Sequence, residues 1–412
     1  MTKKSDAPAI RFKGFSDAWE QRKLGDIADI VGGGTPSTGN QSYWDGDIDW
    51  YAPAEIADQI YANSSQKKIT GLGYENSSAK MLPPGTVLFT SRAGIGKTAI
   101  LTRKGCTNQG FQSIVPHRGE LDSYFIFSRT EELKRYGELV GAGSTFVEVS
   151  GKQMAVMELM MPPTMREQQT IGGFFQQLDN LITLHQRKFE KLTNVKKSML
   201  EKMFPQNGSS YPEIRFKGFT DPWEQRKLGE MGQTYTGLSG KTKDDFGHGQ
   251  ARFVTYMNVF SNPISNPEMT EPIEIDPKQN EVEVGDVFFT TSSETPEEVG
   301  MSSILLEKRG KTYLNSFCFG FRPSEKIDSY YLAYMLRSES TRAKIILLAQ
   351  GISRYNISKN KVMEIAVSLP SLDEQKMIGQ YFSQLDNLIT LHQRELEKLQ
   401  NIKKSMLEKM FV

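Results

Sequence analysis

Cysteine is nearly absent from this sequence, which has two cysteines, Cys106 and Cys318, in 412 residues. They lie far apart and neither belongs to a CxxC motif, which argues against a disulfide framework and against a zinc site built on cysteine. No apolar run approaches the roughly 20 residues that cross a bilayer. The first residues, MTKKSDAPAIRFKGF, contain no apolar segment of a secretory signal. We therefore expect a cytoplasmic protein.

An excess of charge of one sign is also missing. The chain has 50 Lys and Arg against 49 Asp and Glu, so its net charge is +1. Proteins that bind nucleic acid usually carry a clear basic excess on at least one domain. Any contact with DNA must therefore come from local patches, or be shared with partner subunits that clamp the duplex. The length predicts two or three domains.

What the sequence does contain is a long internal repeat, in the order A-x-B-A-y-B. Block A, PAIRFKGFSDAWEQRKLGDI at residues 8–27, returns as PEIRFKGFTDPWEQRKLGEM at 212–231 with about three-quarters of its positions identical. Block B, which begins EQQTIGGFFQQLDNLITLHQR at residue 167, returns as EQKMIGQYFSQLDNLITLHQR at residue 374. One fold is thus used twice.

The regions x and y between the blocks share a pattern but few residues. GTVLFTS at 85–91 parallels GDVFFTT at 285–291, and NQGFQSIVP from Asn108 parallels NSFCFGFRP from Asn315. Short β-rich runs with Gly, Pro, Asn and Asp breaks, and one helix near Tyr124–Tyr136 or Tyr330–Leu348, predict an α/β (α+β) globule in each copy. Because loops carry most of the differences, each globule can present different chemistry from one frame.

Each B block predicts a helix of about 30 residues, from Phe174 to Phe204 and from Tyr381 to Phe411, without Gly or Pro. Apolar residues and one histidine recur every seven residues, which is typical of a coiled-coil seam. The first seam is Leu178, His185, Leu192 and Met199 with Ile182, Phe189 and Met203, and the second is Leu385, His392, Leu399 and Met406 with Ile389, Leu396 and Met410. The matching seams predict that the two helices pack together.

The short linker PQNGSSY at 205–211 fixes the direction of this packing. The second helix starts from globule y and must run back, which predicts an antiparallel coiled coil and a pseudo-two-fold arrangement in which the carboxyl end returns near Pro8. A helix of 30 residues is about 45 Å long, and one turn of duplex DNA is about 34 to 36 Å. Globules x and y differ in sequence, so at that distance they suit two different DNA half-sites. The helices would then fix the number of base pairs between the half-sites.

We expect four segments: residues 1–164 and 206–371 form two recognition domains, and residues 165–205 and 372–412 form the spacer helices. In the first domain, hydroxyl, aromatic, amide and basic side chains on loops suit contacts with phosphates and base edges. These candidates are Thr35, Ser37, Tyr43, Arg92, Lys97, Asn108 and Gln109. A solvated hairpin tip at Arg92 and Lys97, and a plain turn at Asn-Gln-Gly, remain equally open. Trp44 is interpreted as a core residue.

In the second domain the same kinds of side chain occur at other positions. The candidates are Lys241, Lys243, Arg252, Tyr256, Asn258, Arg354 and Asn356. Arg354 and Asn356 occupy the place of Thr145, Phe146 and Val147 in the first copy. The alternative for Arg354 is a salt bridge to Glu294 or to another neighbour.

Motifs of catalysis are weak by comparison. SRAGIGKT at 91–98 resembles a phosphate-binding loop, but Ser91 stands where glycine is needed and the strand-like AILTR follows the lysine. Glu374-Gln375-Lys376 imitates part of a nuclease motif, although helix capping explains the glutamate better. No Asn-Pro-Pro-Tyr methyltransferase motif is present. We expect no catalytic residue and no metal site.

Two further features of the helices have ordinary interpretations. His185 and His392 match on the seam, which favours packed residues that fix the register over metal ligands. The lysine pairs Lys196-Lys197 and Lys403-Lys404 are typical of solvated faces. The near identity of the two helices, beside heads that differ, suggests that each helix binds a copy of one partner.

Taken together, these residues resemble the specificity subunit of type I restriction-modification enzymes over essentially the full length. The resemblance rests on the duplicated layout, on GGGTPST at Gly32–Thr38 followed by YW at Tyr43, on NQGF at Asn108–Phe111 and on the EQ that opens each B helix. At the place of GGGTPST the second copy has TGLSGKTKDDFGHG from Thr236.

The resemblance implies two target recognition domains, helices that set the spacer, and a role in phage defence. It implies partners: double-stranded DNA, two adenine-N6 methyltransferase subunits and, through them, ATP-driven restriction and translocase subunits. S-adenosylmethionine, ATP and Mg²⁺ are then expected in the partner subunits, with no cofactor in this chain and no membrane partner. Two alternatives remain: the chain is itself a methyltransferase or nuclease, or it is a coiled-coil adaptor that never touches DNA.

Overall fold

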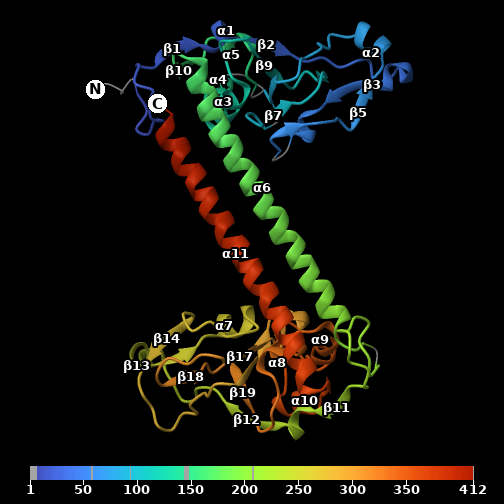
Figure 1. Cartoon of the computed structure of the whole chain (residues 1–412), viewed down its shortest axis with the longest axis vertical. Helices are drawn as coiled ribbons and strands as arrows, with labels where there is room; N and C mark the ends of the chain where they lie inside the picture. The colour runs from blue at the N-terminus through green and yellow to red at the C-terminus, as the bar shows by residue number, and fades with distance from the viewer. Residues whose placement is uncertain (1–6, 57–58, 93, 143–147, 207, 412) are drawn as a thin grey trace. The chain divides into compact units, whose positions relative to one another are not determined.

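The computed structural model describes residues 7–56, 59–92, 94–142, 148–206 and 208–411. The chain forms two compact units, and each unit contains part of both long helices. Unit 1 consists of Met1–His185 with Glu395–Val412, and unit 2 consists of Gln186–Arg394. Helices and strands are mixed in both units, as expected for an α+β fold (Figure 1).

A five-stranded sheet with the order β2-β9-β6-β7-β4 forms the centre of unit 1. Its strands are β2 (Ala28–Gly32), β4 (Tyr61–Ala62), β6 (Val87–Phe89), β7 (Thr98–Leu101) and β9 (Gln112–Pro116). A three-stranded sheet, β5-β3-β8, lies beyond it and consists of β3 (Trp44–Tyr51), β5 (Lys67–Ile69) and β8 (Cys106–Thr107). Strand β1 (Glu20–Lys23), from block A, pairs antiparallel with β10 (Glu158–Met161), which directly precedes block B.

The helix expected near Tyr124–Tyr136 is two helices, α3 (Ser123–Ser128) and α4 (Thr130–Gly141). The chain breaks at Arg129, whose buried guanidinium donates to Glu132 and to the carbonyl oxygen of Met160. Anchoring this side chain beneath β10 turns the backbone there. The shorter helices of unit 1 are α1 (Leu24–Ile27), α2 (Gly71–Glu75) and α5 (Gly151–Ala155), with 3₁₀ turns η1 (Gln41–Tyr43) and η2 (Pro53–Glu55).

Unit 2 repeats this plan with a four-stranded sheet of order β12-β19-β15-β17. Its strands are β12 (Gly232–Thr236), β15 (Val287–Thr290), β17 (Ser302–Ile304) and β19 (Cys318–Pro323). The second sheet, β14-β13-β18, contains β13 (Phe246–Val254), β14 (Thr270–Ile273) and β18 (Thr312–Leu314). Strand β11 (Glu224–Lys227) pairs with β21 (Ala366–Leu369), and β16 (Ser292–Ser293) pairs with β20 (Tyr355–Asn356).

The expected helix near Tyr330–Leu348 is also two helices, α8 (Ser329–Met335) and α9 (Glu339–Ile346). Ser338 starts the second of these because its hydroxyl accepts from the backbone N–H of Thr341. The other helical segments of unit 2 are α7 (Tyr256–Ser261), α10 (Lys359–Met363), η3 (Leu228–Glu230), η4 (Lys243–Asp245) and η5 (Pro296–Glu298).

The long helices begin earlier than their glycine-free stretches indicate. Helix α6 spans Met165–Lys202 and α11 spans Leu372–Met410, with 38 and 39 residues. The helices therefore include Gly172 and Gly379. A Cβ at Gly172 would lie 2.6 Å from a carboxylate oxygen of Asp122, the residue that caps α3, so the glycine allows α6 to pack closely on that helix start.

Within each unit the two long helices lie side by side and run in opposite directions (Figure 1). In unit 1, Asp179 in the first half of α6 forms an ion pair of 2.6 Å with Lys403 near the end of α11. In unit 2, Asp386 in the first half of α11 forms one of 2.5 Å with Lys196 near the end of α6. Solvation of Lys196 and Lys403 was thus the wrong interpretation, because each is paired with a carboxylate across the seam.

The predicted seam residues contribute to the cores of the units. Leu178 shares a hydrophobic cluster with Leu399 and Met406 in unit 1. Leu385 shares one with Leu192 and Met199 in unit 2. The aromatic residues at the helix ends complete these cores: Phe175 stacks on Phe411, and Phe204 stacks on Phe382.

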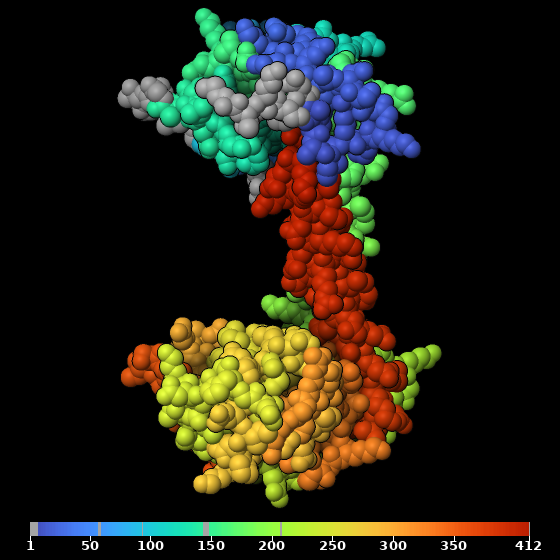
Figure 2. Space-filling model, turned by 90° about the vertical axis from the view of Figure 1, so that its left-hand side faces the viewer, coloured from blue at the N-terminus to red at the C-terminus, as the bar shows by residue number. Residues whose placement is uncertain are grey.

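The carboxyl end of α11 meets block A of unit 1. The backbone N–H of Ile10 donates to the carbonyl oxygen of Lys409 at 3.0 Å, and in unit 2 that of Ile214 donates to Lys202 at 2.9 Å. Figure 2 shows the red end of α11 against the blue amino-terminal segment. The first block A lies next to the end of α11, and the second block A lies next to the end of α6, which it follows along the chain. This confirms the expected return of the carboxyl end near Pro8.

Candidate nucleic-acid interface

Both units hold their variable loops on the same backbone frame. A Cβ at Gly33 would lie 2.0 Å from the carbonyl oxygen of Asn108, and one at Gly237 would lie 2.0 Å from that of Asn315. TGLSG from Thr236 therefore takes the structural place of the GGGT run from Gly32. Glycine is needed at both positions because two backbone segments touch there. The structure thus agrees with the place that the sequence assigned to this segment.

The asparagine of each NQGF-like segment builds a tight turn. The side-chain oxygen of Asn108 accepts from the N–H of Gly110 at 2.7 Å, and that of Asn315 accepts from the N–H of Phe317 at 2.9 Å. The turn interpretation of Asn-Gln-Gly is thus confirmed. The turn leaves Gln109 exposed in unit 1 and Phe317 exposed in unit 2.

Several predicted residues of unit 1 gather around this turn. The hydroxyl of Thr35 is hydrogen-bonded to the side-chain oxygen of Gln109. The N–H of Ser91 donates to Gly110 at 2.8 Å, which brings the neighbouring Arg92 to the same place. Arg92 also lies 4.0 Å from a carboxylate oxygen of Glu148. Thr35, Arg92, Asn108 and Gln109 therefore form one loop cluster.

The other candidates of unit 1 lie on neighbouring loops. Ser37 is exposed, and its carbonyl oxygen accepts from the indole of Trp44 at 3.1 Å. Trp44 packs edge-on against Trp50 at 5.1 Å and belongs to the margin of a core cluster, as expected. Tyr43 is half-buried against α2, and Lys97 is exposed. Strand β7 follows Lys97 directly, which confirms that no P-loop helix is present there.

In unit 2 a surface cleft of about 390 Å³ brings together Tyr256, Ser292 and Arg354. The guanidinium of Arg354 donates to the hydroxyl of Ser292 at 3.2 Å, and the hydroxyl of Tyr256 donates to the Ser292 carbonyl oxygen at 2.8 Å. Asn356 is exposed and pairs with Ser292 in the β16–β20 ladder. Within the described ranges, Arg354 makes no ion pair, so the expected alternative of a salt bridge to Glu294 is not formed.

Burial also affects the phenol of this cleft. Desolvation raises the pKa of Tyr256 above its usual value, so its hydroxyl stays protonated at neutral pH and can donate. The residues that correspond to Arg354 and Tyr355 in unit 1 are Phe146 and Val147, which lie, with Thr145, outside the described residues.

Asn258 requires a correction. It is fully buried, and its amide group donates to the carbonyl oxygens of Asn266 and Met269 and accepts from the N–H of Asn266. An amide used in this way holds its own loop and has no group left for a base. From the sequence, an asparagine that holds a buried loop cannot be told from an exposed asparagine that contacts a base.

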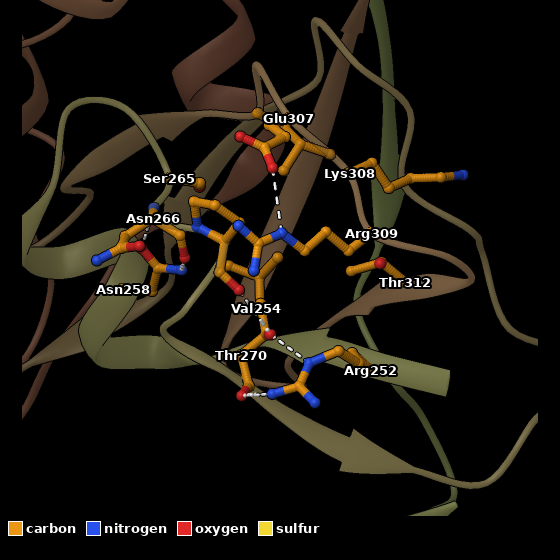
Figure 3. Close-up of a pocket in the computed structure, with 12 residues that line it drawn as sticks. Arg252, Val254, Asn258, Ser265, Asn266, Thr270, Glu307, Lys308, Arg309 and Thr312 are labelled. Atoms are coloured by element: carbon orange, nitrogen blue, oxygen red, sulfur yellow. Dashed lines mark hydrogen bonds and ion pairs between the residues drawn. The ribbon is translucent and has the colours of Figure 1, made fainter. Parts of the chain in front are cut away.

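Arg252 also has internal partners, because its guanidinium donates to the hydroxyl and to the carbonyl oxygen of Thr270 (Figure 3). The crevice that Arg252 and Asn258 line has about 10 Å³ of free volume, which is room for about one water molecule. A base does not fit there.

The two lysines of the TGLSGKTKDD segment differ. Lys241 is 2.9 Å from Asp276 and 3.7 Å from Asp245, and its hydrogen bond holds the pKa of Asp276 well below the usual range. Lys243, in η4, is exposed. Of the two, Lys243 is the one available to a phosphate.

Two buried ion pairs join block A to block B, and sequence reasoning missed both. Arg11 donates two hydrogen bonds to Glu167 at 2.6 and 2.8 Å, and Arg215 donates two to Glu374 at 2.7 and 2.8 Å. Both glutamates are 1% exposed. Glu374 lies in the first turn of α11, as the capping interpretation expects, and its carboxylate in addition binds Arg215. The available signal was the repetition of RFKGF together with EQ in both copies.

A tyrosine hydroxyl also binds the aspartate of each ion pair that joins the two long helices. The hydroxyl of Tyr124 donates to Asp179 at 2.8 Å, and that of Tyr334 donates to Asp386 at 2.9 Å. Burial, and then the neighbouring aspartate, raises the pKa of both phenols, which keeps the donors protonated. Tyr124 of α3 and Tyr334 of α8 are not at equivalent positions of the repeat. Both units therefore keep a tyrosine–aspartate hydrogen bond but supply the tyrosine from different positions.

Within the described part of the chain, no group of three or more His, Cys, Asp or Glu side chains is arranged to hold a metal ion. None of the described helices contains an apolar stretch long enough to cross a membrane.

The chain thus contains two copies of one fold, and each copy has different side chains on a shared loop frame. The family described as the type I restriction modification DNA specificity domain matches residues 16–194 and again residues 220–401. The chain belongs to this family and carries two copies of its domain.

Individual relatives agree with this assignment. The MjaIX specificity subunit of Methanocaldococcus jannaschii is 31% identical over 235 residues, which cover 55% of this chain and 54% of that subunit, so the aligned part spans about half of the relative. The putative MjaX specificity subunit of the same organism is 24% identical over 94% of this chain and 92% of its own length.

Among solved structures, a type I restriction-modification S subunit from M. genitalium has a TM-score of 0.56 at 14% identity. The alignment covers 98% of this chain and 99% of that one. At this identity the likeness concerns the fold.

Proposed function

We propose that the chain recognises a two-part, asymmetric DNA target, with one half-site read by each unit. The observation that carries this proposal is the shared loop frame with different contents. The same glycine contact and the same asparagine turn present Gln109, Thr35 and Arg92 in unit 1. In unit 2 they present an exposed phenylalanine, Phe317, and the cleft that contains Arg354 lies on the neighbouring loops. Arginine and amide side chains are the groups that read guanine and adenine in the major groove.

We further propose that the chain performs no chemistry and docks two copies of a methyltransferase subunit, which in turn bring restriction and translocase subunits. S-adenosylmethionine, ATP and Mg²⁺ would bind to those partners. Leu181 and Leu184 of α6 match Leu388 and Leu391 of α11 in the repeat, and all four side chains are 44 to 51% exposed. Exposed leucines repeated on two nearly identical helices support two equivalent docking surfaces.

The test is a map of N6-methyladenine across the genome of the host, with and without the gene. We expect a gapped motif with two unlike halves that disappears when the gene is deleted and returns when it is restored. Purified chain incubated with DNA and S-adenosylmethionine should transfer no methyl group. Methyl transfer by the purified chain would favour the enzyme alternative, and an unchanged methylation pattern after deletion would favour the adaptor alternative.

The role of the helices in setting the unread spacer stays a prediction, and a deletion tests it. Removing one heptad from each helix, residues 187–193 and 394–400, keeps the seam in phase. Seven residues rise about 10 Å, which corresponds to about 3 base pairs at 3.4 Å each. The methylated motif should keep both halves and lose about 3 base pairs of spacer. A motif with its original spacer would contradict the prediction.

A further inference from the structure

Each unit places one arginine at the same corner of its fold, from a different strand. In unit 1 the corner is formed by Ser91, Arg92 and Glu148, and in unit 2 by Thr291, Ser292, Arg354 and Asn356. The N–H of Val149 donates to Ser91 at 3.0 Å, and that of Ile357 donates to Thr291 at 3.0 Å. We call this place the arginine corner.

The strand register shows that the two arginines are not sequence equivalents. Arg92 bridges to Glu148, and Ser292 bridges to Asn356. Arg92 therefore stands at the position of Ser292, on the first strand of the corner. Arg354 lies immediately before β20, on the opposite segment of the corner, and donates to that same serine. Two different positions in the repeat thus supply a guanidinium to the same place in the two units.

The arginine corner lies beside the asparagine turn in both units. Ser91 donates to Gly110 at 2.8 Å, and Thr291 donates to Phe317 at 2.9 Å. Unit 2 adds two apolar side chains that solvent surrounds, Phe317 at 56% and Ile352 at 96% exposure. A corner with a guanidinium next to an amide or to exposed apolar groups has the chemistry of a base reader.

The neighbouring carboxylates argue for a base rather than a phosphate as the ligand. Glu148 lies 4.0 Å from Arg92, and Glu294 and Glu298 line the cleft that contains Arg354. A phosphate placed at either corner would meet these negative charges at short range. Guanine presents two neutral acceptors, O6 and N7, and its partner cytosine presents an amino group that a carboxylate can accept from.

We propose that each unit reads a guanine in the major groove through its arginine corner, with Arg92 in one half-site and Arg354 in the other. This inference rests on the proposed function, because it assumes that each unit reads a half-site. It deepens that function by naming the base and the residue in each unit.

The experiment restores the deleted gene in its host as wild type, Arg354→Ala, Arg354→Lys or Arg92→Ala, and compares methylation at sites that differ by one base. Arg354→Ala should reduce the preference for guanine at one position of one half-site by about 5- to 150-fold. Arg92→Ala should do the same in the other half-site. Each variant is the control for the other, because Arg354→Ala changes only unit 2 and Arg92→Ala changes only unit 1. The preference in the half-site of the unaltered unit should stay the same.

Arg354→Lys separates base reading from a charge effect. Lysine keeps the positive charge but loses the planar fork that binds two acceptors at once. We expect it to lose most of the guanine preference and keep overall methylation. If the wild type methylates a gapped motif but Arg354→Lys keeps the full preference, or if neither arginine variant alters a guanine position, the inference is overturned while the proposed function stands. If the wild type methylates no gapped motif, both fall.

Discussion

Replacing Glu374 by alanine is expected to lower the stability of unit 2 by about 3 to 5 kcal/mol, because it leaves the buried guanidinium of Arg215 without its charge partner. Arg215 is 15% exposed in its side chain and makes two hydrogen bonds to this carboxylate. The change should appear in calorimetry as a downward shift of one part of the unfolding profile. Glu167→Ala is the matched variant and should shift the part that belongs to unit 1.

The double variant Glu374→Leu with Arg215→Met shows whether the loss comes from the unpaired charge. Removing both charges and keeping side-chain volume is often neutral for a buried ion pair. We therefore expect the double variant to recover most of the stability that Glu374→Ala loses. If Glu374→Ala leaves the unfolding profile unchanged, the ion pair does not hold block A to block B.

Changing Leu181 and Leu184 together to glutamate is expected to remove one of two bound methyltransferase subunits, and changing Leu388 and Leu391 should remove the other. Burying two carboxylates in an apolar contact without partners costs several kcal/mol, which corresponds to at least a 100-fold loss of affinity at about 1.4 kcal/mol per factor of ten. Complexes purified from the host through a tag on this chain and weighed by native mass spectrometry should contain one partner copy fewer.

The control for this experiment is Leu347→Glu, at a leucine that is 84% exposed and lies outside the repeated helices. It should leave two partner copies bound. Complexes that keep both copies in the Leu181/Leu184 and Leu388/Leu391 variants would place the docking surfaces elsewhere.

The repeat predicted much of the architecture because it constrains whole segments. The matched heptads indicated that the two long helices pair, and the short linker indicated that they run antiparallel. The ion pairs of Asp179 and Asp386 with the opposite helix agree with both predictions. The break at Arg129 was not predicted, because the arginine is buried under a strand 31 residues away. A local pattern contains no information about such a distant acceptor.

The candidate site was predicted less well, since residue type does not decide whether a polar group faces solvent. Asn258 and Asn108 were both candidates for contacts with DNA, yet Asn258 is fully buried and the side-chain oxygen of Asn108 closes a turn. The ion pairs of Glu167 and Glu374 join residues 156 and 159 positions apart. The sequence shows that these residues are charged, but it does not show that the glutamates pair with Arg11 and Arg215.

The contact between Ile10 and Lys409 has a further consequence for how such a chain is encoded. The last turn of α11 meets the first block A through the same backbone hydrogen bond that joins Lys202 of α6 to Ile214 of the second block A. A circular permutation that opens the chain in the linker at 205–211 and joins the segment after Lys409 to the segment before Ile10 is expected to preserve both contacts. If each unit reads one half-site, as proposed, the order of the two recognition units along the chain is then not fixed by these contacts.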